Sequence, residues 1–181
     1  MTTQVTRRMT PATALVAAMK QAATEIVTAS GNMPYLRLLQ DGLWVYGSED
    51  TEVEKGSVWA CDIASFIRGY QAWSKKDGLK GEVIQLITDQ PVLRSDLEDV
   101  GAEWKTVSGF NLVCISGEAE GLMVQYKTTS KGGCKEIGIF LAAVIARIES
   151  KPKDGTYIPV VSLGSDSYKH KDYGKTYTPV I

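Results

Sequence analysis

The chain has 181 residues, of which 44% are apolar and 23% charged, and its formal net charge at pH 7 is -1. These values lie near the averages of soluble globular proteins and exclude collagen-like, low-complexity and wholly disordered chains. The longest uncharged apolar stretch, residues 137–146, is about half of the roughly 20 residues that a membrane-spanning helix needs. We therefore expect a soluble protein with one main domain and no membrane contact.

The cysteine and histidine content limits the chemistry. Cys61, Cys114 and Cys134 are widely spaced and include no Cys-x-x-Cys pair, which is typical of a protein in a reducing cytoplasm. The sequence has one histidine, His170, so a zinc site with two imidazoles is excluded. We predict a protein that is not an enzyme and that has neither a metal site nor a cofactor.

Charge is distributed unevenly along the chain. Residues 1–34 carry a balance of +2, residues 35–104 of -6, and residues 105–181 of +3. This distribution excludes a uniformly basic nucleic-acid binder, but it allows a molecule with one acidic and one basic face.

Residues 10–29 have the pattern of an amphipathic helix. Thr10 is a suitable N-cap, and apolar residues follow at helical spacing until Gly31. We therefore predict an N-terminal helix or arm over residues 1–32 and a single β-barrel domain over residues 33–181.

The next segment has the alternation and the turn signal of a β-hairpin. Residues 35–39 and 43–46 flank Asp41-Gly42, a pair that readily supplies the positive backbone angles of a tight primed turn. Residues 58–61 predict another strand. Residues 63–73 are ambiguous, because their apolar residues have helix-like spacing whereas Gly69 weakens a helix.

The second half of the chain predicts several strands and one helix. Each strand is bounded by Gly, Pro or Asp, and the strands are residues 81–88, 104–107, 110–116, 122–128, 157–163 and 175–181. Residues 135–149 repeat apolar residues at the helical period, which predicts a buried helix of about four turns. Residues 164–174 predict a polar and aromatic loop. The whole pattern favours a mainly β (α+β) fold, built as a small antiparallel barrel or sandwich.

Two lysine-rich segments are candidate anion sites. Lys127, Lys131 and Lys135 accompany hydroxyls and glycines ahead of the predicted helix, where backbone N–H groups favour phosphate. No Walker loop is present. In the second segment Lys169, Lys171 and Lys175 alternate with Tyr168, His170 and Tyr173, which combines charge for a phosphate backbone with rings for base stacking. Either segment is equally compatible with a solvated loop.

Aromatic residues are frequent in the first half of the domain. Trp44 and Tyr46 share one face of the predicted hairpin, and Trp59, Tyr70 and Trp73 follow. Trp44, Tyr46 and Trp59 are candidate stacking residues, although a place in the core explains each of them as well.

Two acidic runs, residues 49–54 and 96–103, lack the alternating pattern of a calcium loop. They favour solvated acidic faces.

Five segments together resemble a group of small tailed-phage proteins. They are Met-Pro-Tyr-Leu-Arg-Leu (33–38), Asp-Gly-Leu-Trp-Val-Tyr-Gly (41–47), Gly-Ser-Val-Trp-Ala (56–60), Tyr-Lys-Thr-Thr-Ser-Lys-Gly-Gly (126–133) and Ser-Tyr-Lys-His-Lys-Asp-Tyr-Gly-Lys-Thr-Tyr-Thr-Pro-Val (167–180). The group is associated with phage replication and recombination regions and with single-stranded DNA-binding proteins of the oligonucleotide-binding (OB) barrel type. The slightly acidic charge and the lack of an acidic C-terminal tail depart from such proteins.

The resemblance implies an OB-like antiparallel barrel with one packed helix and an N-terminal helix. It also implies that the protein binds single-stranded DNA in the host-cell cytoplasm during phage replication or recombination. The six lysines of the two segments would contact phosphates, and Trp44, Tyr46, Trp59, Tyr168 and Tyr173 would stack on bases beside His170. Replication proteins of the host or phage are expected partners, and a homo-oligomer is compatible with this reading. The alternative is a phage protein that binds and inhibits a host protein through its acidic surfaces.

Overall fold

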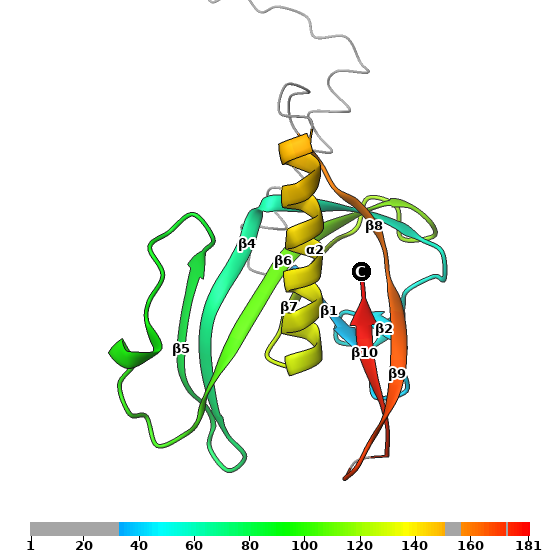
Figure 1. Ribbon diagram of the computed structural model, residues 1–181. Coiled ribbons are helices and arrows are strands. Elements are labelled where there is room, and N and C mark those ends of the chain that lie inside the picture. The colour runs from blue at the N-terminus through cyan, green and yellow to red at the C-terminus, as the bar shows by residue number, and fades with distance from the viewer. Residues whose placement is uncertain (1–32, 151–156, 173) are drawn as a thin grey trace, which may run out of the picture. The chain divides into compact units, whose positions relative to one another are not determined.

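The computed structural model describes residues 33–150, 157–172 and 174–181, which form a mainly β unit with one long helix (Figure 1). The predicted N-terminal helix lies outside the described residues. The elements are β1 (Tyr35–Leu38), β2 (Trp44–Tyr46), β3 (Thr51–Glu52), β4 (Val58–Ser74), β5 (Gly78–Leu86), the 3-10 turn η1 (Arg94–Asp96), β6 (Trp104–Ser116), β7 (Met123–Thr128), α2 (Lys131–Ser150), β8 (Val160–Ser162), β9 (Gly164–His170) and β10 (Gly174–Val180).

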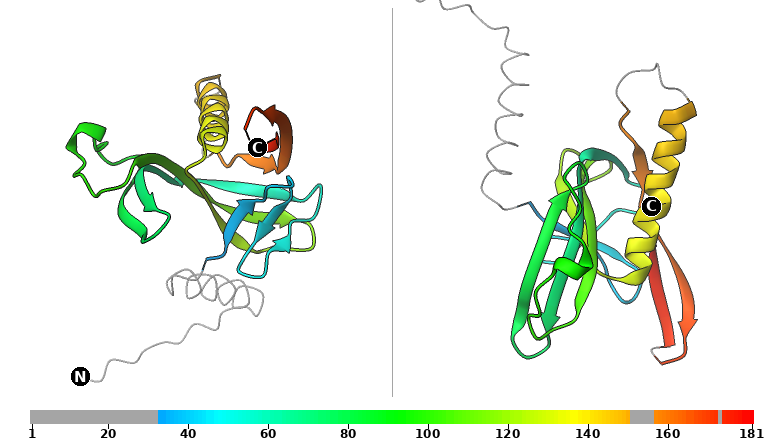
Figure 2. Two further views of the ribbon diagram at one scale, coloured as in Figure 1. Left: turned by 90° about the horizontal axis from the view of Figure 1, so that it is seen from below. Right: turned by 60° about the vertical axis from the view of Figure 1, so that its left-hand side comes forward.

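Within the described ranges, eight strands form one curled sheet that closes half of a barrel (Figure 2). The strand order is β3-β2-β1-β7-β6-β4-β5, and β8 pairs with the start of β4. All the pairings in this sheet are antiparallel except β1 with β7, which is parallel. β9 and β10 form a separate two-stranded sheet. The predicted barrel is therefore present as an open half-barrel.

The long strand β4 organises this sheet. β6 pairs along one edge of it, while the other edge pairs with β8 at residues 58–60 and with β5 at residues 67–74. The β4–β6 register shifts between Asp62 and Ile67, and such irregularities bend a strand and increase its twist. Strands β4 and β5 approach so closely at Gly69 that an added Cβ would lie 1.9 Å from the carbonyl oxygen of Val83.

The ambiguous segment 63–73 is part of this strand, so a helix there would be wrong. The register shift interrupts the period-two alternation, and the apolar residues on either side of it consequently imitate helical spacing. The predicted strands 104–107 and 110–116 likewise form one continuous strand, β6, through Gly109.

The hairpin β1–β2 is confirmed, but its turn differs from the predicted primed turn. Leu39 N donates to Leu43 O at 2.8 Å and Gly42 N donates to Leu39 O at 3.1 Å. Gly42 has a φ of 89°, whereas Asp41 has no positive φ. This is a three-residue connection, in which a glycine in the left-handed region follows an ordinary turn.

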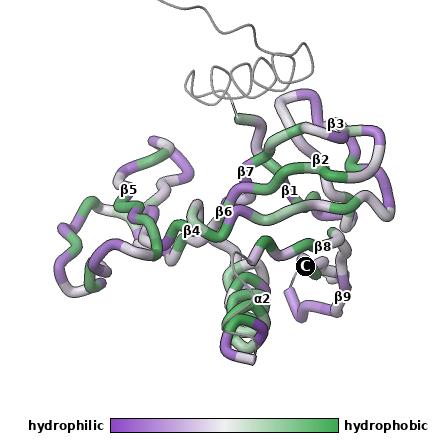
Figure 3. Tube along the Cα trace, turned by 90° about the horizontal axis from the view of Figure 1, so that it is seen from above, coloured by the Kyte–Doolittle hydropathy of each residue, from purple (hydrophilic) through white to green (hydrophobic). Residues whose placement is uncertain are grey.

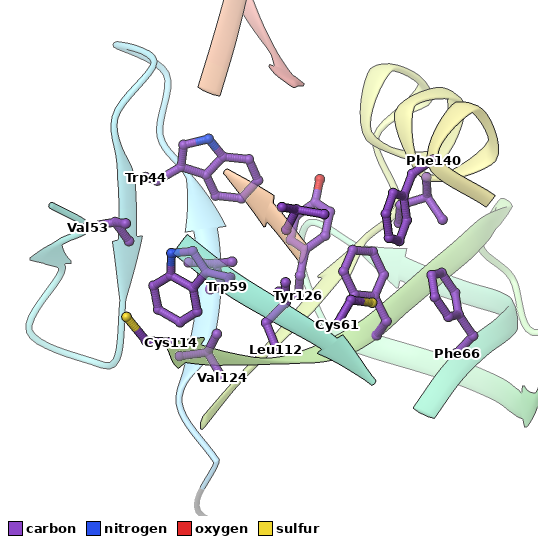
Figure 4. Close-up of a cluster of buried hydrophobic side chains, with 14 of the residues drawn as sticks. Trp44, Val53, Trp59, Cys61, Phe66, Leu112, Cys114, Val124, Tyr126 and Phe140 are labelled. Atoms are coloured by element: carbon purple, nitrogen blue, oxygen red, sulfur yellow. The ribbon is translucent and has the colours of Figure 1, made fainter. Parts of the chain in front are cut away.

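The core lies between the half-barrel and α2 (Figure 4). Phe66, Phe110 and Phe140 stack on one another, with ring centroids 4.6 to 6.0 Å apart. Phe140 belongs to α2, so this stack fixes the helix on the sheet. The predicted helix is confirmed, but it begins at Lys131 instead of residue 135.

The predicted loop 164–174 is wrong, because residues 164–170 form β9 and pair with β10. Figure 3 shows that β9 is mostly hydrophilic, so its side chains carry no apolar alternation that would predict a strand. Backbone pairing forms this two-stranded unit, here called the β9–β10 ribbon. No helix among the described residues is long and apolar enough to cross a membrane.

Replacing Gly69 tests the close approach of β4 and β5. Gly69→Ala should lower the free energy of unfolding by about 1–3 kcal/mol, because the new methyl group overlaps the backbone of β5. The matched control, Gly138→Ala on exposed helix surface with no atom within 4 Å of the added Cβ, should raise it by about 0.5–1 kcal/mol. Urea denaturation followed by tryptophan fluorescence measures both changes. A Gly69→Ala variant as stable as the parent would contradict this packing.

Candidate nucleic-acid interface

The β9–β10 ribbon separates its side chains by alternation. Lys169 pairs directly with Lys175, and Ser167 pairs with Tyr177, so these four residues share one face, here called the lysine face. Tyr168 pairs with Thr176 and lies on the opposite face with His170. The predicted phosphate contacts and the predicted stacking ring therefore lie on different faces of the ribbon.

The lysine face places two like charges opposite each other. Like charges directly across an antiparallel pair are destabilising by roughly 0.2–1 kcal/mol. Neither Lys169 nor Lys175 has an ion pair among the described residues, but the Lys175 ammonium lies 4.7 Å from the centre of the Tyr177 ring. A bound anion would relieve this repulsion.

A groove of about 570 Å³ lies between β10 and the paired strands β1 and β7, and it is here called the seam groove. Residues of β1 and the end of β7 line one side, and residues of β10 line the other. Its cations are Arg37, Lys127 and Lys175, and its aromatic rings are Tyr126 and Tyr177. Two of the predicted lysines, Lys127 and Lys175, are therefore brought into one groove, although 48 positions separate them in the sequence.

The ribbon is attached beside this groove by polar contacts near its base. The Trp44 indole N–H donates to Gly164 O at 2.7 Å, and the Ser165 hydroxyl donates to Gly42 O at 2.8 Å. The Tyr177 ring lies against Gly42, where an added Cβ would be 2.4 Å from a ring carbon. Gly42 is therefore needed twice: its positive φ forms the turn, and its lack of a side chain leaves room for the Tyr177 ring.

Trp44 and Trp59 are not available for stacking on bases. Trp44 is 6% exposed and Trp59 is fully buried, and both belong to the core (Figure 4). The Trp59 indole N–H donates to the Ser57 hydroxyl at 2.9 Å, which satisfies the buried donor. Tyr46 is half-buried and packs against the same core. The predicted stacking role of the two tryptophans is therefore wrong. Trp44 lies on β2, where the successive residues Trp44 and Val45 are both buried, and Trp59 is fully buried on β4.

Two of the groove's cations are already paired with acids. Lys127 Nζ lies 2.8 Å from Glu82 Oε1, and Arg37 pairs with Asp50. A phosphate would have to compete with these carboxylates, so we expect the unpaired Lys175 to contribute more than Lys127.

Lys131 and Lys135 lie in the first two turns of α2 and are exposed. The segment ahead of the helix is shorter than predicted, because the helix begins at Lys131 and Ser130 caps it. Gly133 N donates to the Ser130 hydroxyl at 2.9 Å, and Cys134 N donates to Ser130 O.

The remaining predicted residues belong to the second lysine-rich segment, at the end of β9 and in the turn that follows it. Tyr168 is 49% exposed, and its ring contacts that of His170 edge-on at 6.3 Å. Lys171 is exposed in the turn after β9, and Tyr173 lies outside the described residues.

Three elements bring lysines to one end of the described domain. The end of the β9–β10 ribbon, the first turn of α2 and the turn between β4 and β5 all lie at the lower end in Figures 1 and 2 (right), here called the basic end. The lysines of these three elements are Lys75, Lys76, Lys80, Lys131, Lys135, Lys169, Lys171 and Lys175, and their acids are Asp77, Glu136, Asp166 and Asp172. The acidic run 96–103 lies next to the β4–β5 hairpin, because Trp104 pairs with Ala72. Folding therefore brings lysines from three separate segments of the chain to this end.

Sequence reasoning missed Arg37 and Tyr177 as groove residues. Arg37 follows a strand pattern in which it is merely the outward residue, so no local signal distinguishes it. Tyr177 lies in the predicted C-terminal strand, but only the fold brings its ring, together with the Lys175 side chain, to the groove beside β1.

Burial shifts the pKa of several titratable side chains in this domain. Burial raises the pKa of the Cys61 thiol to about 12, so this group stays protonated and unreactive. Burial also raises the pKa of Tyr126, at the floor of the groove, to about 12. Among the described residues, no group of three His, Cys, Asp or Glu side chains is arranged to hold a metal ion.

A search of protein-family models, of curated proteins and of solved structures finds no match to this chain.

The indole of Trp44 provides a test of ribbon attachment. Trp44→Phe keeps a core ring but removes the bond to Gly164, at a cost of about 1 kcal/mol. Amide hydrogens of the β9–β10 ribbon should therefore exchange faster, on the order of fivefold, in exchange followed by mass spectrometry or NMR. Trp59→Phe loses an equivalent bond away from the ribbon and is the control. Equal ribbon exchange in both variants would refute the role of this bond.

Proposed function

We propose that this domain binds single-stranded nucleic acid, with DNA as the expected form, at the seam groove and the basic end. In this proposal the protein binds the nucleic acid and does not catalyse a reaction on it. One observation carries the proposal: Lys169 and Lys175 face each other beside a groove that already contains Arg37, Lys127 and Tyr177. A cationic groove with aromatic rings is the combination that proteins use to hold a single strand without sequence preference.

The connectivity of the half-barrel supports the same function. Strands β4, β6 and β7 form an antiparallel meander, α2 follows, and β8 returns antiparallel to β4. This is the order expected of an OB-type Greek-key barrel, a fold that often binds oligonucleotides. Here β1 pairs with the free edge of β7, and β10 stays apart from it, which leaves the seam groove between them.

The resemblance to small tailed-phage proteins supplies the biological setting of the proposal. It points to replication or recombination of phage DNA in the host-cell cytoplasm, with replication proteins as further partners. The segments that carry the resemblance include both the β1–β2 hairpin and the β9–β10 ribbon, which flank the seam groove.

Neutralising the lysine face tests the proposal. Lys169→Ala combined with Lys175→Ala should weaken binding of a fluorescent oligonucleotide of about 30 nucleotides, measured by anisotropy. The slope of log K against log salt should fall by about 1.4, since each phosphate contact on a single strand contributes about 0.7. Folding stability should not fall, because the substitutions remove a like-charge pair.

The matched control is Lys55→Ala combined with Arg147→Ala, which removes two exposed positive charges outside the lysine face. It should leave the slope unchanged. An equal loss in both double variants would mean that binding depends on net charge alone and would contradict a defined site. Absence of binding by the parent at low salt would refute the proposed function, and the exposed acids of residues 49–54 and 96–103 would then direct a search for a basic protein partner.

A further inference from the structure

The turn between β4 and β5 carries an aromatic residue that no part of the core requires. Trp73 is 59% exposed, and its cross-strand partner Leu79 is 46% exposed. The preceding residue, Ala72, is fully buried. A large apolar ring kept in solvent beside a well-packed strand is typical of a recognition surface.

Local backbone structure keeps the Trp73 ring outward. The β4–β5 register shifts between Ala72 and Trp73, and a bulge of this kind redirects a side chain. The Ser74 hydroxyl accepts hydrogen bonds from two backbone amides of the β4–β5 turn, Lys76 N at 3.2 Å and Asp77 N at 3.3 Å. The Trp73 ring lies over Gly78, 3.9 Å from the position of an added Cβ. The ring is thus held at a defined place by a short, well-bonded turn.

The turn that carries this ring is rich in lysine. Lys75, Lys76 and Lys80 are all exposed, and the one acid of the turn, Asp77, pairs with Lys80 at 3.0 Å. Lys75 and Lys76 have no ion pair among the described residues. Lysine is depleted at protein–protein interfaces, whereas single-stranded nucleic acid selects an aromatic ring with adjacent positive charge.

We infer that the β4–β5 turn is a second contact point for the nucleic acid, with Trp73 stacking on a base and Lys75 and Lys76 contacting the adjoining phosphates. This inference rests on the proposed function. It also accounts for base stacking, since Trp44 and Trp59 are buried in the core. The turn and the β9–β10 ribbon both lie at the basic end, so one strand can extend from the seam groove towards Trp73 (Figures 1 and 2).

Tryptophan fluorescence provides a direct readout of this contact. Of the four tryptophans, Trp44 and Trp59 are buried and Trp104 is half-buried, with its indole N–H bonded to Glu98 O at 2.8 Å. Trp73 should therefore supply most of the acrylamide-accessible emission. Titration with oligothymidylate of about 30 nucleotides should quench this emission as the base stacks on the ring.

Three variants separate stacking from other effects. Trp73→Ala should weaken oligothymidylate binding about tenfold, as expected for one lost stacking contact. Trp73→Phe keeps a flat ring, so it should retain most of the affinity but lose the quenching signal. The control, Ile145→Ala, truncates a similarly exposed side chain on α2 and should leave affinity and quenching unchanged. Thermal melting of each variant followed by circular dichroism establishes that the fold is intact.

The outcomes distinguish this inference from the function on which it rests. Quenching in the parent together with the tenfold loss in Trp73→Ala would support it. Anisotropy that shows tight binding, but with no quenching and with parental affinity in Trp73→Ala, would overturn the second contact and leave the seam groove as the site. If the parent bound no oligothymidylate at low salt, both the proposed function and this inference would fail.

Discussion

The pairing of β4 along both of its edges is the constraint on which the rest of the domain depends. One edge pairs with β6 on both sides of the irregularity at residues 62–67, while the other edge changes partner there from β8 to β5. The bend lets the sheet curl around Phe66, and Gly69 permits the close approach of β5. The same strand extends beyond the core to the turn that exposes Trp73, and its pairing with β8 brings the chain back to where the β9–β10 ribbon begins. Core, turn and ribbon are therefore positioned by one element.

The residues that stabilise the fold and the residues that carry the positive charge lie in different parts of the domain. Its core uses phenylalanine and tryptophan rings between the sheet and α2, whereas β9 is polar and mostly exposed, and the ribbon buries few apolar side chains, chiefly Tyr177 and Pro179 of β10. Polar contacts near its base, from Trp44 to Gly164 and from Ser165 to Gly42, link it to the hairpin β1–β2. This construction tolerates Lys169 opposite Lys175, a repulsive pair whose small cost the core can offset. An element of this kind can present charge to a ligand without weakening the fold.

The tryptophans show how one residue type takes different roles in the same sheet. Trp44 lies on a strand covered on both faces and uses its indole N–H to hold the ribbon, while Trp59 is sealed among Cys61, Leu112 and other core residues. Trp73 leaves the core at a bulge, next to three lysines. All three have similar strand-like sequence surroundings, so composition and spacing could not separate them. Exposure depends on what covers each face of the strand, and that covering comes from distant segments such as α2 and β8.

The sequence by itself determined the elements with strong local signals. These are the hairpin around Asp41-Gly42, the strands β5, β7 and β10, and the helix that carries Ile137, Phe140 and Val144, because turn chemistry and apolar periodicity act over a few residues. Tertiary structure alone decided that residues 63–73 continue β4, that residues 164–170 form a strand, and that β1 pairs in parallel with β7. It also decided the candidate site, since Arg37, Lys127 and Lys175 meet only when β1, β7 and β10 are brought together. The physical reason is that strand pairing and groove formation join residues far apart in the chain, so no local pattern records them.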